Sequence, residues 1–511
     1  MSDINMDPTS STTSIVADNN LPINLFTRTT SDAIPQSTYF LPSSWRRYQL
    51  SELINKVLQN NNDNDNNQGK KPVPFEFLIN GEVLRGSLEN WVKRNRGNDE
   101  ETTIDIEYVR STLPPKQVGK IEVEDWVSGL SLQRNGYILL SSYLSHLQIL
   151  PLSTNASTSS ALYTLPLPTS LGATSCTWVS PSSKESNVLL AAGGVDRLTH
   201  VFNLPSLSPD NNIGEQQPKE IYTLHGHTGP ISSIIASKSG KELISGSWDT
   251  NLNFYILPDP EEEEPTTHQI ESEPLSYLPG QNNKKRRKLE KQIYPDGKEP
   301  IEGLLDNDST GLGGWRRIPD FQLKGHKDRI GGLVWDKLDN QKIWSASWDG
   351  SVRGWDLNSG INSVIRQGPF DKSALCIDQW ESNGTLATGN MDRTICLWDT
   401  RQATSLISLT LPTNSPIPSL KTHPTSSFTL ASATYSGLIQ IWDIRSPKHS
   451  LFQISSSTSS SASTMKESER RKVTKNGKVL GERLLSLDWN GDLLVAGGED
   501  GEVNIYNATG A

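Results

Sequence analysis

Short runs of alternating apolar and polar residues recur along the chain after residue 117, and such runs predict β-strands that bury one face. In most copies the run follows a stretch of small residues and a tight turn that contains an Asp. The spacings from 354 to 397 and from 397 to 441 lie in the range of about 40 to 45 residues that is typical of a four-stranded propeller blade. We therefore expect seven blades in residues 117–511, ending in LQIL at 147, VFNL at 201, FYIL at 254, GWDL at 354, LWDT at 397, IWDI at 441 and IYNA at 505.

The turn before each of these endings should be held by a side chain that accepts the backbone N–H groups of the bend. We expect this role for Asp196, Asp249, Asp349, Asp392 and Asp500. His227 and His326, each preceded by Gly, come before the first strand of their blades, and each imidazole is expected to link the Asp to a strand hydroxyl. Ser145 and Ser436 are expected at the Asp position of two other blades, which should be fixed less tightly.

A ring of sheets has to close, because an open sheet edge invites aggregation. The last blade lacks a fourth strand, since few residues follow its ending at 505. The segment Val118–Val123 precedes the first blade and has strand character. We predict that it pairs with the last blade and joins the two ends of the ring.

Residues 23–112 follow a different pattern. They predict strands at 23–28 and 38–42, an amphipathic helix over 48–58, a hairpin at 75–86 with Asn80-Gly81 at its bend, a short helix at 87–95, and a strand at 103–109. This order resembles a ubiquitin-like fold. We expect residues 1–22 and the Asn/Asp-rich loop between the first helix and the hairpin to be disordered.

Composition narrows the function classes. The net charge of −10 argues against a uniformly basic nucleic-acid binder, and three cysteines without a C-x-x-C pair predict neither a disulfide framework nor a zinc site. We see no apolar run that would span a membrane and no secretory signal. Insertions at about 258–319 and 451–480 are expected to be disordered, and the first contains a basic cluster of nuclear-signal form, Lys284, Lys285, Arg286, Arg287 and Lys288.

Motifs for catalysis are missing from the sequence. There is no phosphate-binding loop, no nucleophile elbow, and no paired His ligands, so we predict a protein that is not an enzyme and needs no cofactor. One acidic stretch remains, Asp99, Glu100 and Glu101, directly before the strand predicted at 103–109. Judged from these residues alone, it is a solvated turn.

The order of the two domains carries a resemblance. The repeats are similar to WD repeats, and the segments PVPFEFLINGEVLRGSLENWV, IEYVRSTLPPK and EDWVSGL resemble the WD-repeat ribosome-biogenesis subunit of the Pescadillo (PeBoW) complex. The resemblance implies an all-β seven-bladed WD-repeat β-propeller preceded by an α+β ubiquitin-like domain of the NLE type. It further implies a scaffold for large-subunit (60S) biogenesis and pre-rRNA processing, located in the nucleolus and nucleoplasm.

The same resemblance implies partners and a site. The ring would bind a block-of-proliferation-type propeller protein and, with Pescadillo, form a heterotrimer on the pre-60S particle. The ubiquitin-like head would bind the metal-ion-dependent domain of midasin, an AAA ATPase, and release the subunit from the particle. Glu101 would supply a carboxylate oxygen to the divalent ion held by midasin, and the choice between Glu101 and Glu100 stays open.

Two other functions remain as alternatives. The basic insertions could contact pre-rRNA directly through phosphates, or the ring could be the substrate adaptor of a ubiquitin ligase. Trp248 and Trp348, beside turn aspartates, are candidate anchors for a partner, although packing inside the blades is the favoured interpretation for both. No membrane contact is expected.

Overall fold

The computed structural model describes residues 20–28, 32–60, 72–95, 102–111, 113–133, 136–144, 146–152, 161–167, 172–179, 187–205, 218–257, 315–368, 372–401, 407–455 and 482–508. Contacts between residues divide the chain into two compact units, one ending at Leu113 and one beginning at Pro114. We call the first unit the head and the second the ring. Within the described residues, no helix combines the length and the apolar character needed to cross a membrane.

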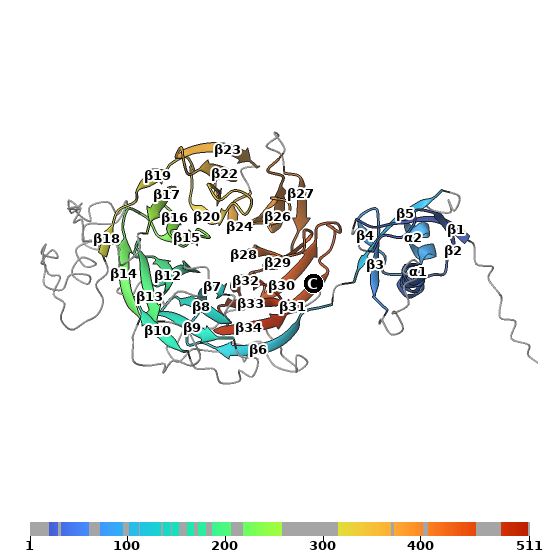
Figure 1. Cartoon of the computed structure of the whole chain (residues 1–511), viewed down its shortest axis with the longest axis horizontal. Helices are drawn as coiled ribbons and strands as arrows, with labels where there is room; N and C mark the ends of the chain where they lie inside the picture. Colours follow the sequence, from blue (N-terminus) through green and yellow to red (C-terminus); the bar gives the residue numbers. More distant parts are fainter. Residues whose placement is uncertain are drawn as a thin grey trace, which may run out of the picture. The chain divides into compact units, whose positions relative to one another are not determined.

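The head is a five-stranded sheet in the order β2-β1-β5-β3-β4 with two helices (Figure 1). β1 and β5 are parallel, whereas β3 pairs with β5 and β4 in the antiparallel sense. Asn80 and Gly81 both have positive φ, 52° and 75°, as a two-residue hairpin turn of this hand requires. The elements are β1 (Asn20–Phe26), β2 (Thr38–Pro42), α1 (Arg47–Asn60), β3 (Phe75–Ile79), β4 (Glu82–Val83), α2 (Leu88–Asn95) and β5 (Ile104–Arg110).

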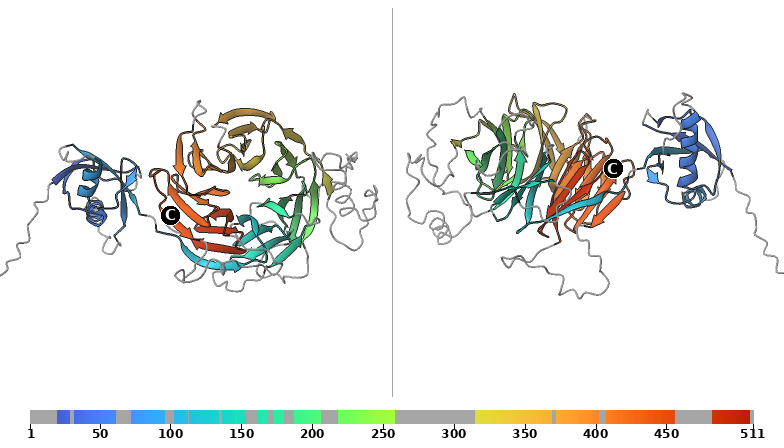
Figure 2. Two further views of the ribbon diagram at one scale, coloured as in Figure 1. Left: turned by 180° about the vertical axis from the view of Figure 1, so that it is seen from behind. Right: turned by 60° about the horizontal axis from the view of Figure 1, so that its bottom comes forward.

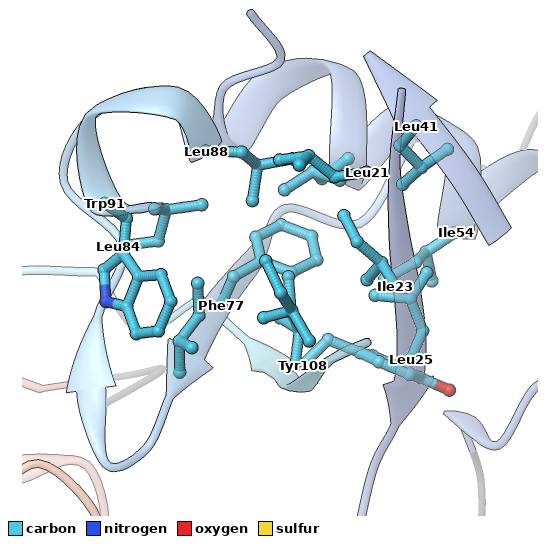
Figure 3. Close-up of a cluster of buried hydrophobic side chains, with 14 of the residues drawn as sticks. Leu21, Ile23, Leu25, Leu41, Ile54, Phe77, Leu84, Leu88, Trp91 and Tyr108 are labelled. Atoms are coloured by element: carbon cyan, nitrogen blue, oxygen red, sulfur yellow. The ribbon is translucent and has the colours of Figure 1, made fainter. Parts of the chain in front are cut away.

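The head has its own hydrophobic core between the sheet and the helices (Figure 3). Leu50 and Ile54 lie one turn apart on α1 and are fully buried, as helical spacing allows. On the sheet, Ile23, Phe77 and Tyr108 face them from three different strands. This core is the reason that the short chain of the head can hold a defined sheet.

The ring contains seven sheets around a common centre (Figures 1 and 2). In each blade the strand that comes first in the chain segment 127–490 is the innermost one. These innermost strands are β7, β11, β15, β20, β24, β28 and β32, and they contact one another in succession. Blades 1 to 3 are β7 (Val127–Gln133), β8 (Tyr137–Ser142), β9 (His146–Pro151), β10 (Tyr163–Pro166); β11 (Ala173–Trp178), β12 (Asn187–Gly194), β13 (Thr199–Pro205), β14 (Lys219–Leu224), β18 (Trp315–Arg317); and β15 (Ile231–Ala236), β16 (Glu242–Ser247), β17 (Leu252–Ile256), β19 (Phe321–Leu323).

The remaining blades follow the same plan. They are β20 (Ile330–Trp335), β21 (Lys342–Ser347), β22 (Ser351–Asp356), β23 (Ile361–Gln367); β24 (Ala374–Gln379), β25 (Leu386–Asn390), β26 (Thr394–Trp398), β27 (Leu409–Pro412); β28 (Ser419–Thr422), β29 (Thr429–Ala433), β30 (Leu438–Asp443), β31 (Phe452–Ser455); and β32 (Leu484–Asn490), β33 (Leu493–Gly498), β34 (Glu502–Asn507), β6 (Lys116–Glu122). Apolar clusters join adjacent blades: Ile439 of blade 6, for example, packs with Leu487 and Leu494 of blade 7. Each blade therefore depends on its neighbours for a buried face.

The predicted closing strand is confirmed, with bounds shifted slightly toward the N-terminus. β6 pairs with β34 in the antiparallel sense, with Ile121 opposite Val503 and Gly119 opposite Ile505. Ile121 is 4 % exposed and packs with Val127 of the first blade. The two ends of the ring thus share one sheet, and no blade has to be completed by a later segment.

Three segments expected to be disordered are partly ordered. β1 begins at Asn20, because Leu21 pairs with Leu41 and is buried in the head core. β18 lies inside the predicted insertion at 258–319 and adds a fifth, parallel strand to blade 2 through Tyr222 and Trp315. β31 lies inside the insertion at 451–480, where it is needed as the outer strand of blade 6. The rest of these predictions, at 1–19, 258–314 and 456–480, lies outside the described residues, as does most of the Asn/Asp-rich loop.

Candidate functional site

The candidate metal-binding end of the head is built around the start of β5. β5 is the central strand of its sheet, hydrogen bonded to β1 on one side and to β3 on the other. Its core side carries Ile104, Ile106 and Tyr108, so the strand is fixed by packing as well as by its two ladders. A side chain just before β5 is therefore attached to the best-supported strand of the head.

The opposite face of β5 carries carboxylates. Asp105 is exposed and accepts a hydrogen bond from Asn24 Nδ2 at 3.0 Å, and Asn24 Oδ1 accepts one from Thr38 Oγ1 at 2.9 Å. Glu107 is buried and lies 3.2 Å from Arg28 Nε. Asp105 is thus a second acidic group close in sequence to the acidic stretch, and its alternation with Ile104 and Ile106 is the sequence signal that places it on the open face.

The far end of β5 is fastened to the segment after β1. Arg110 donates two hydrogen bonds of 2.6 Å to the carboxylate of Asp32. The Tyr108 hydroxyl donates to the carbonyl of Asp32 at 2.7 Å and accepts from the N–H of Ile34 at 3.0 Å. These bonds keep β5 from sliding along its axis relative to the rest of the head.

Asp99, Glu100 and Glu101 lie outside the described residues, and the chain is described again from Thr102. The basic cluster from Lys284 to Lys288 also lies outside them. The metal-ligand role of Glu101 and the nuclear-signal role of the cluster therefore remain predictions. Among the described residues, no group of three or more His, Cys, Asp or Glu side chains is arranged to hold a metal ion by itself.

In the ring, His227 and His326 lie in matching polar networks. His227 contacts Asp249 Oδ2 at 3.0 Å and the Ser245 hydroxyl at 2.8 Å through its two ring nitrogens. His326 makes the same contacts with Asp349 at 3.2 Å and with Ser345 at 2.7 Å. In both blades the network therefore joins a turn to the middle of a strand.

Hydrogen bonds stabilise the ionised carboxylate of the turn Asp in these networks. Burial alone would raise the pKa of Asp349, but hydrogen bonds from His326, the Lys327 N–H and Ser351 hold that pKa well below its usual range. Burial is also the largest influence on His326, whose pKa is lowered although Asp349 opposes the change. An ionised Asp beside a neutral His is the arrangement that these directions favour.

In blade 2 the turn Asp also contacts a buried His, but the sequence pattern does not reveal this residue. Asp196 Oδ2 contacts His200 Nε2 at 3.0 Å, and His200 Nδ1 contacts Glu220 Oε1 at 2.6 Å. Burial would lower the pKa of His200, but the two carboxylates raise it to about 9. His200 is the second residue of β13 and does not follow a Gly, so only the pairing of β13 with β14 brings it to Glu220.

The two remaining turn aspartates differ from these. Asp392 accepts hydrogen bonds from Lys372 Nζ at 2.8 Å and from the N–H of Thr394 at 3.2 Å. Asp500 accepts one from the N–H of Glu502 at 3.2 Å, while its other oxygen is buried and has no hydrogen-bond donor among the described residues. Burial raises the pKa of Asp500 to about 6.

The serine positions are also resolved by the register. Ser436 hydrogen bonds with Thr434 at 3.0 Å and replaces the Asp in blade 6, as expected. In blade 1 the pairing of Ser141 with Leu147 corresponds to that of Ala346 with Val352 around Asp349. The Asp position is therefore occupied by Leu144, and the assignment of Ser145 is wrong because the turn was aligned one residue too late.

Trp248 is not packed inside its blade, because 46 % of its surface is exposed. The favoured interpretation as blade packing is therefore wrong for this residue. Trp348 is half-buried. Both tryptophans contact the guanidinium of Arg329, a residue that the sequence pattern does not single out.

Comparison with known proteins agrees with this architecture. Residues 21–92 match the model of the NLE (NUC135) domain. Residues 218–255, 318–356 and 365–399 match the WD domain, G-beta repeat. These matches fall on the head and on blades of the ring.

Relatives with a similar sequence extend over nearly the whole chain. The ribosome biogenesis protein YTM1 of Laccaria bicolor is 31 % identical over 486 residues, covering 93 % of this chain and 92 % of the relative. The chain belongs to this YTM1 family. The member from Coprinopsis cinerea is 30 % identical, with 95 % of each chain covered, and that from Emericella nidulans is 28 % identical, with 98 % of each covered. The family names describe ribosome biogenesis proteins and mention no enzyme activity.

Proposed function

We propose that the chain is a non-catalytic scaffold in the biogenesis of the large (60S) ribosomal subunit, acting during pre-rRNA processing. Membership of the YTM1 family supports a role in ribosome biogenesis and hence a nuclear and nucleolar location. The two folded units suit a scaffold, because each has its own core and its own surface. The nucleolus and nucleoplasm are the compartments proposed.

The ring is proposed to bind a block-of-proliferation-type propeller protein and to assemble with Pescadillo into a heterotrimer on the pre-60S particle. A closed seven-bladed ring supports this role because it offers broad, rigid faces whose strand edges are already paired. The contact would therefore be made by side chains of the turns and strands. Backbone pairing with a free edge is not needed.

The head is proposed to bind midasin, with Glu101 completing the coordination of the divalent ion in the midasin metal domain. A carboxylate of the length of Glu is a suitable oxygen ligand for a hard ion such as Mg²⁺. The position of Glu101 three residues before β5 supports the proposal, because β5 is the strand bonded on both sides. Asp105 adds a second negative charge on the open face of the same strand.

This arrangement gives force a direct route. A pull at residue 101 acts along β5, whose ladders with β1 and β3 resist sliding as a set. After β5 the chain passes within a few residues into β6, the strand that closes the ring. ATP-driven tension from midasin would then reach the ring through one continuous stretch of backbone and release the subunit from the particle.

The observation that carries the proposal is the family assignment over the whole chain, and the test is a binding measurement. We expect Glu101→Ala in the full chain to lower affinity for the purified midasin metal domain at least about tenfold in the presence of Mg²⁺, because one ion ligand is lost. Adding EDTA should reduce wild-type binding to the same level. Glu101→Asp should bind weakly, since its carboxylate is one methylene shorter.

Glu100→Ala is the matched control. It removes the same charge one residue earlier and should retain most of the binding, and circular dichroism should show the head folded in both variants. If Glu100→Ala loses binding and Glu101→Ala keeps it, the ligand assignment moves to Glu100. Wild-type binding that persists in EDTA would contradict a metal-bridged contact altogether.

A further inference from the structure

One residue in every blade lies directly before the position of the turn Asp. These seven residues, which we call the rim, are mostly apolar or aromatic. They are Tyr143, Val195, Trp248, Trp348, Met391, Tyr435 and Glu499.

Most of the rim residues make a similar backbone hydrogen bond. The N–H of Trp248 donates to the carbonyl of Pro230, and the N–H of Trp348 donates to that of Arg329, both at 2.9 Å. In each case the acceptor is the residue that precedes the innermost strand of the same blade, and Val195, Met391 and Glu499 repeat this bond. Tyr435 makes a similar bond to the carbonyl of Pro416, three residues before β28. The innermost strands surround the centre of the ring (Figure 1), so the rim lies at one end of the ring around its axis.

Apolar exposure is concentrated on the rim. Trp248 is 46 % exposed, Met391 48 %, and Tyr143 and Val195 37 % each. They make up four of the eight large hydrophobic side chains that are exposed in the described part of the ring, the other four being Ile256, Ile318, Leu338 and Ile365. Large apolar groups gathered in this way on a folded surface indicate a contact site.

Arg329 gives the rim a positive charge. Its Cζ lies 4.4 Å from the ring centre of Trp248 in blade 3 and 5.1 Å from that of Trp348 in blade 4, so two indoles from neighbouring blades hold the guanidinium. In blade 7, Arg483 stacks on Tyr435 at 5.6 Å, but it is also 3.7 Å from Glu499. Within the described residues, Arg329 makes no such ion pair, so its charge is oriented and available for an acid.

The surroundings of Arg329 are also basic. Lys324 and Lys327 are exposed in the same segment as Arg329, between β19 and β20, and Arg393 is exposed on the turn between β25 and β26. The carboxylates of the turn aspartates in blades 3 and 4 are bonded to histidines. Asp328 is the exposed acid in the segment between β19 and β20. The excess of positive charge favours an acidic occupant.

The side chains favour a protein over a nucleic acid. Met391 and Val195 offer apolar contact without a stacking face for a base, and one face of Trp248 is already covered by Arg329. Trp, Tyr and Arg together are also the residue types that contribute most to protein–protein interfaces.

We propose that the rim binds an acidic segment of a partner protein, with an Asp or Glu side chain of that segment held by Arg329 between Trp248 and Trp348. The proposal rests on the scaffold function and deepens it, because it names the face of the ring that binds and the chemistry of its partner. A bidentate carboxylate on a stacked guanidinium would fix both the position and the orientation of the segment.

The test is a selection of random peptides displayed on phage, using the full chain as bait. We expect peptides enriched in Asp and Glu on the wild type, and loss of that enrichment, or a shift toward Lys and Arg, on Arg329→Glu. A selected acidic peptide should bind Arg329→Glu and Trp248→Ala at least about tenfold more weakly. Lys238→Glu is the matched control: it reverses an exposed charge in blade 3, the blade of Trp248, in the turn between β15 and β16, and should leave both results unchanged.

Two outcomes would overturn the proposal. One is selection without an acidic preference, or acidic peptides whose affinity is the same for the wild type, Arg329→Glu and Trp248→Ala. The other is binding of a single-stranded oligouridylate that depends on Arg329 while acidic peptides are not selected, which would make the rim a nucleic-acid surface. Assembly of the wild-type chain with purified Pescadillo and its propeller partner is measured separately, because failure there counts against the scaffold function rather than against the chemistry of the rim.

Discussion

The turn aspartates Asp500 and Asp196 occupy the same position in two blades but have opposite effects on stability. Asp500 has a buried oxygen to which no described residue donates a hydrogen bond, whereas Asp196, at the same position of blade 2, is bonded to a His that is shared with Glu220. The carboxylate of Asp500 lowers the stability of the ring, whereas that of Asp196 is part of a buried charged network. Both effects depend on pH in a direction that can be worked out.

Asp500→Asn should stabilise the ring at neutral pH. The pKa of Asp500 is raised from 3.8 to about 6, so the folded ring keeps this proton to a higher pH than the unfolded chain does. The stability of the ring therefore falls as the pH rises from about 4 to about 6. Removing the charge should raise the free energy of unfolding by roughly 1–2 kcal/mol at pH 7, and by less at pH 5. Urea unfolding at both pH values measures this, with the exposed Asp492→Asn as a control. A loss of stability at pH 7 would show that the carboxylate is needed.

His200→Gln should destabilise the ring most at low pH. The pKa of His200 is raised from 6.5 to about 9, so its stabilising charge is fully present below about pH 6.5 and is lost as the pH rises through about 9. We expect a cost of about 3 kcal/mol at pH 6 that becomes smaller by pH 9, because two buried carboxylates lose their partner. Thermal melts across this range test it. The exposed His449→Gln should show neither the cost nor its pH dependence.

Among the strands of the ring, β6 is the one that joins its two ends. It covers the edge of β34 and places Ile121 against the first blade, so it holds the first and last blades together. The same strand carries the proposed tension from the head.

Replacing Lys116–Glu122 with a Gly/Ser segment of equal length should abolish the single cooperative melt of the ring, because β34 becomes an open edge. Ile121→Ala alone should cost about 2–4 kcal/mol, the usual range for a buried aliphatic side chain. The exposed Lys116→Ala serves as the control and should cost less than about 0.5 kcal/mol. Near-ultraviolet circular dichroism during heating reports the result, and an unchanged melt of the replaced segment would refute the role of β6.

In the part of the chain that the structure describes, the head has one hydrophobic core and the ring has its own clusters between the blades. We therefore expect the head and the ring to unfold separately, each with its own free energy of unfolding. The functional proposal uses this independence, because the head can be loaded by one partner while the ring holds another.

Calorimetry of the full chain should show two transitions. Leu50→Ala, at a fully buried position of the head, should lower one of them, and Ile343→Ala, at a fully buried position of the ring, should lower the other. Hydrogen exchange read by mass spectrometry assigns each transition to its unit. If Leu50→Ala speeds exchange in the blades, the two units unfold together and the independence is wrong.

The repeats and the head could be predicted from sequence because their signals are local. Alternating apolar residues mark strands, Gly-His pairs mark the networks at His227 and His326, and Asn80-Gly81 marks a hairpin. Each of these depends on neighbours a few residues away. The order of elements and the fold class follow from them, as does the need for a closing strand.

Other features exist only once distant segments meet. His200 reaches Glu220 through the pairing of β13 with β14, and the Asp position of blade 1 is set by register rather than by spacing. Arg329 acquires two tryptophan neighbours because adjacent blades bring their turns together. The sequence thus determined which strands and turns form, since these are short-range preferences. The tertiary structure decided which charges are paired, buried or left free, since those depend on contacts between blades that no local pattern encodes.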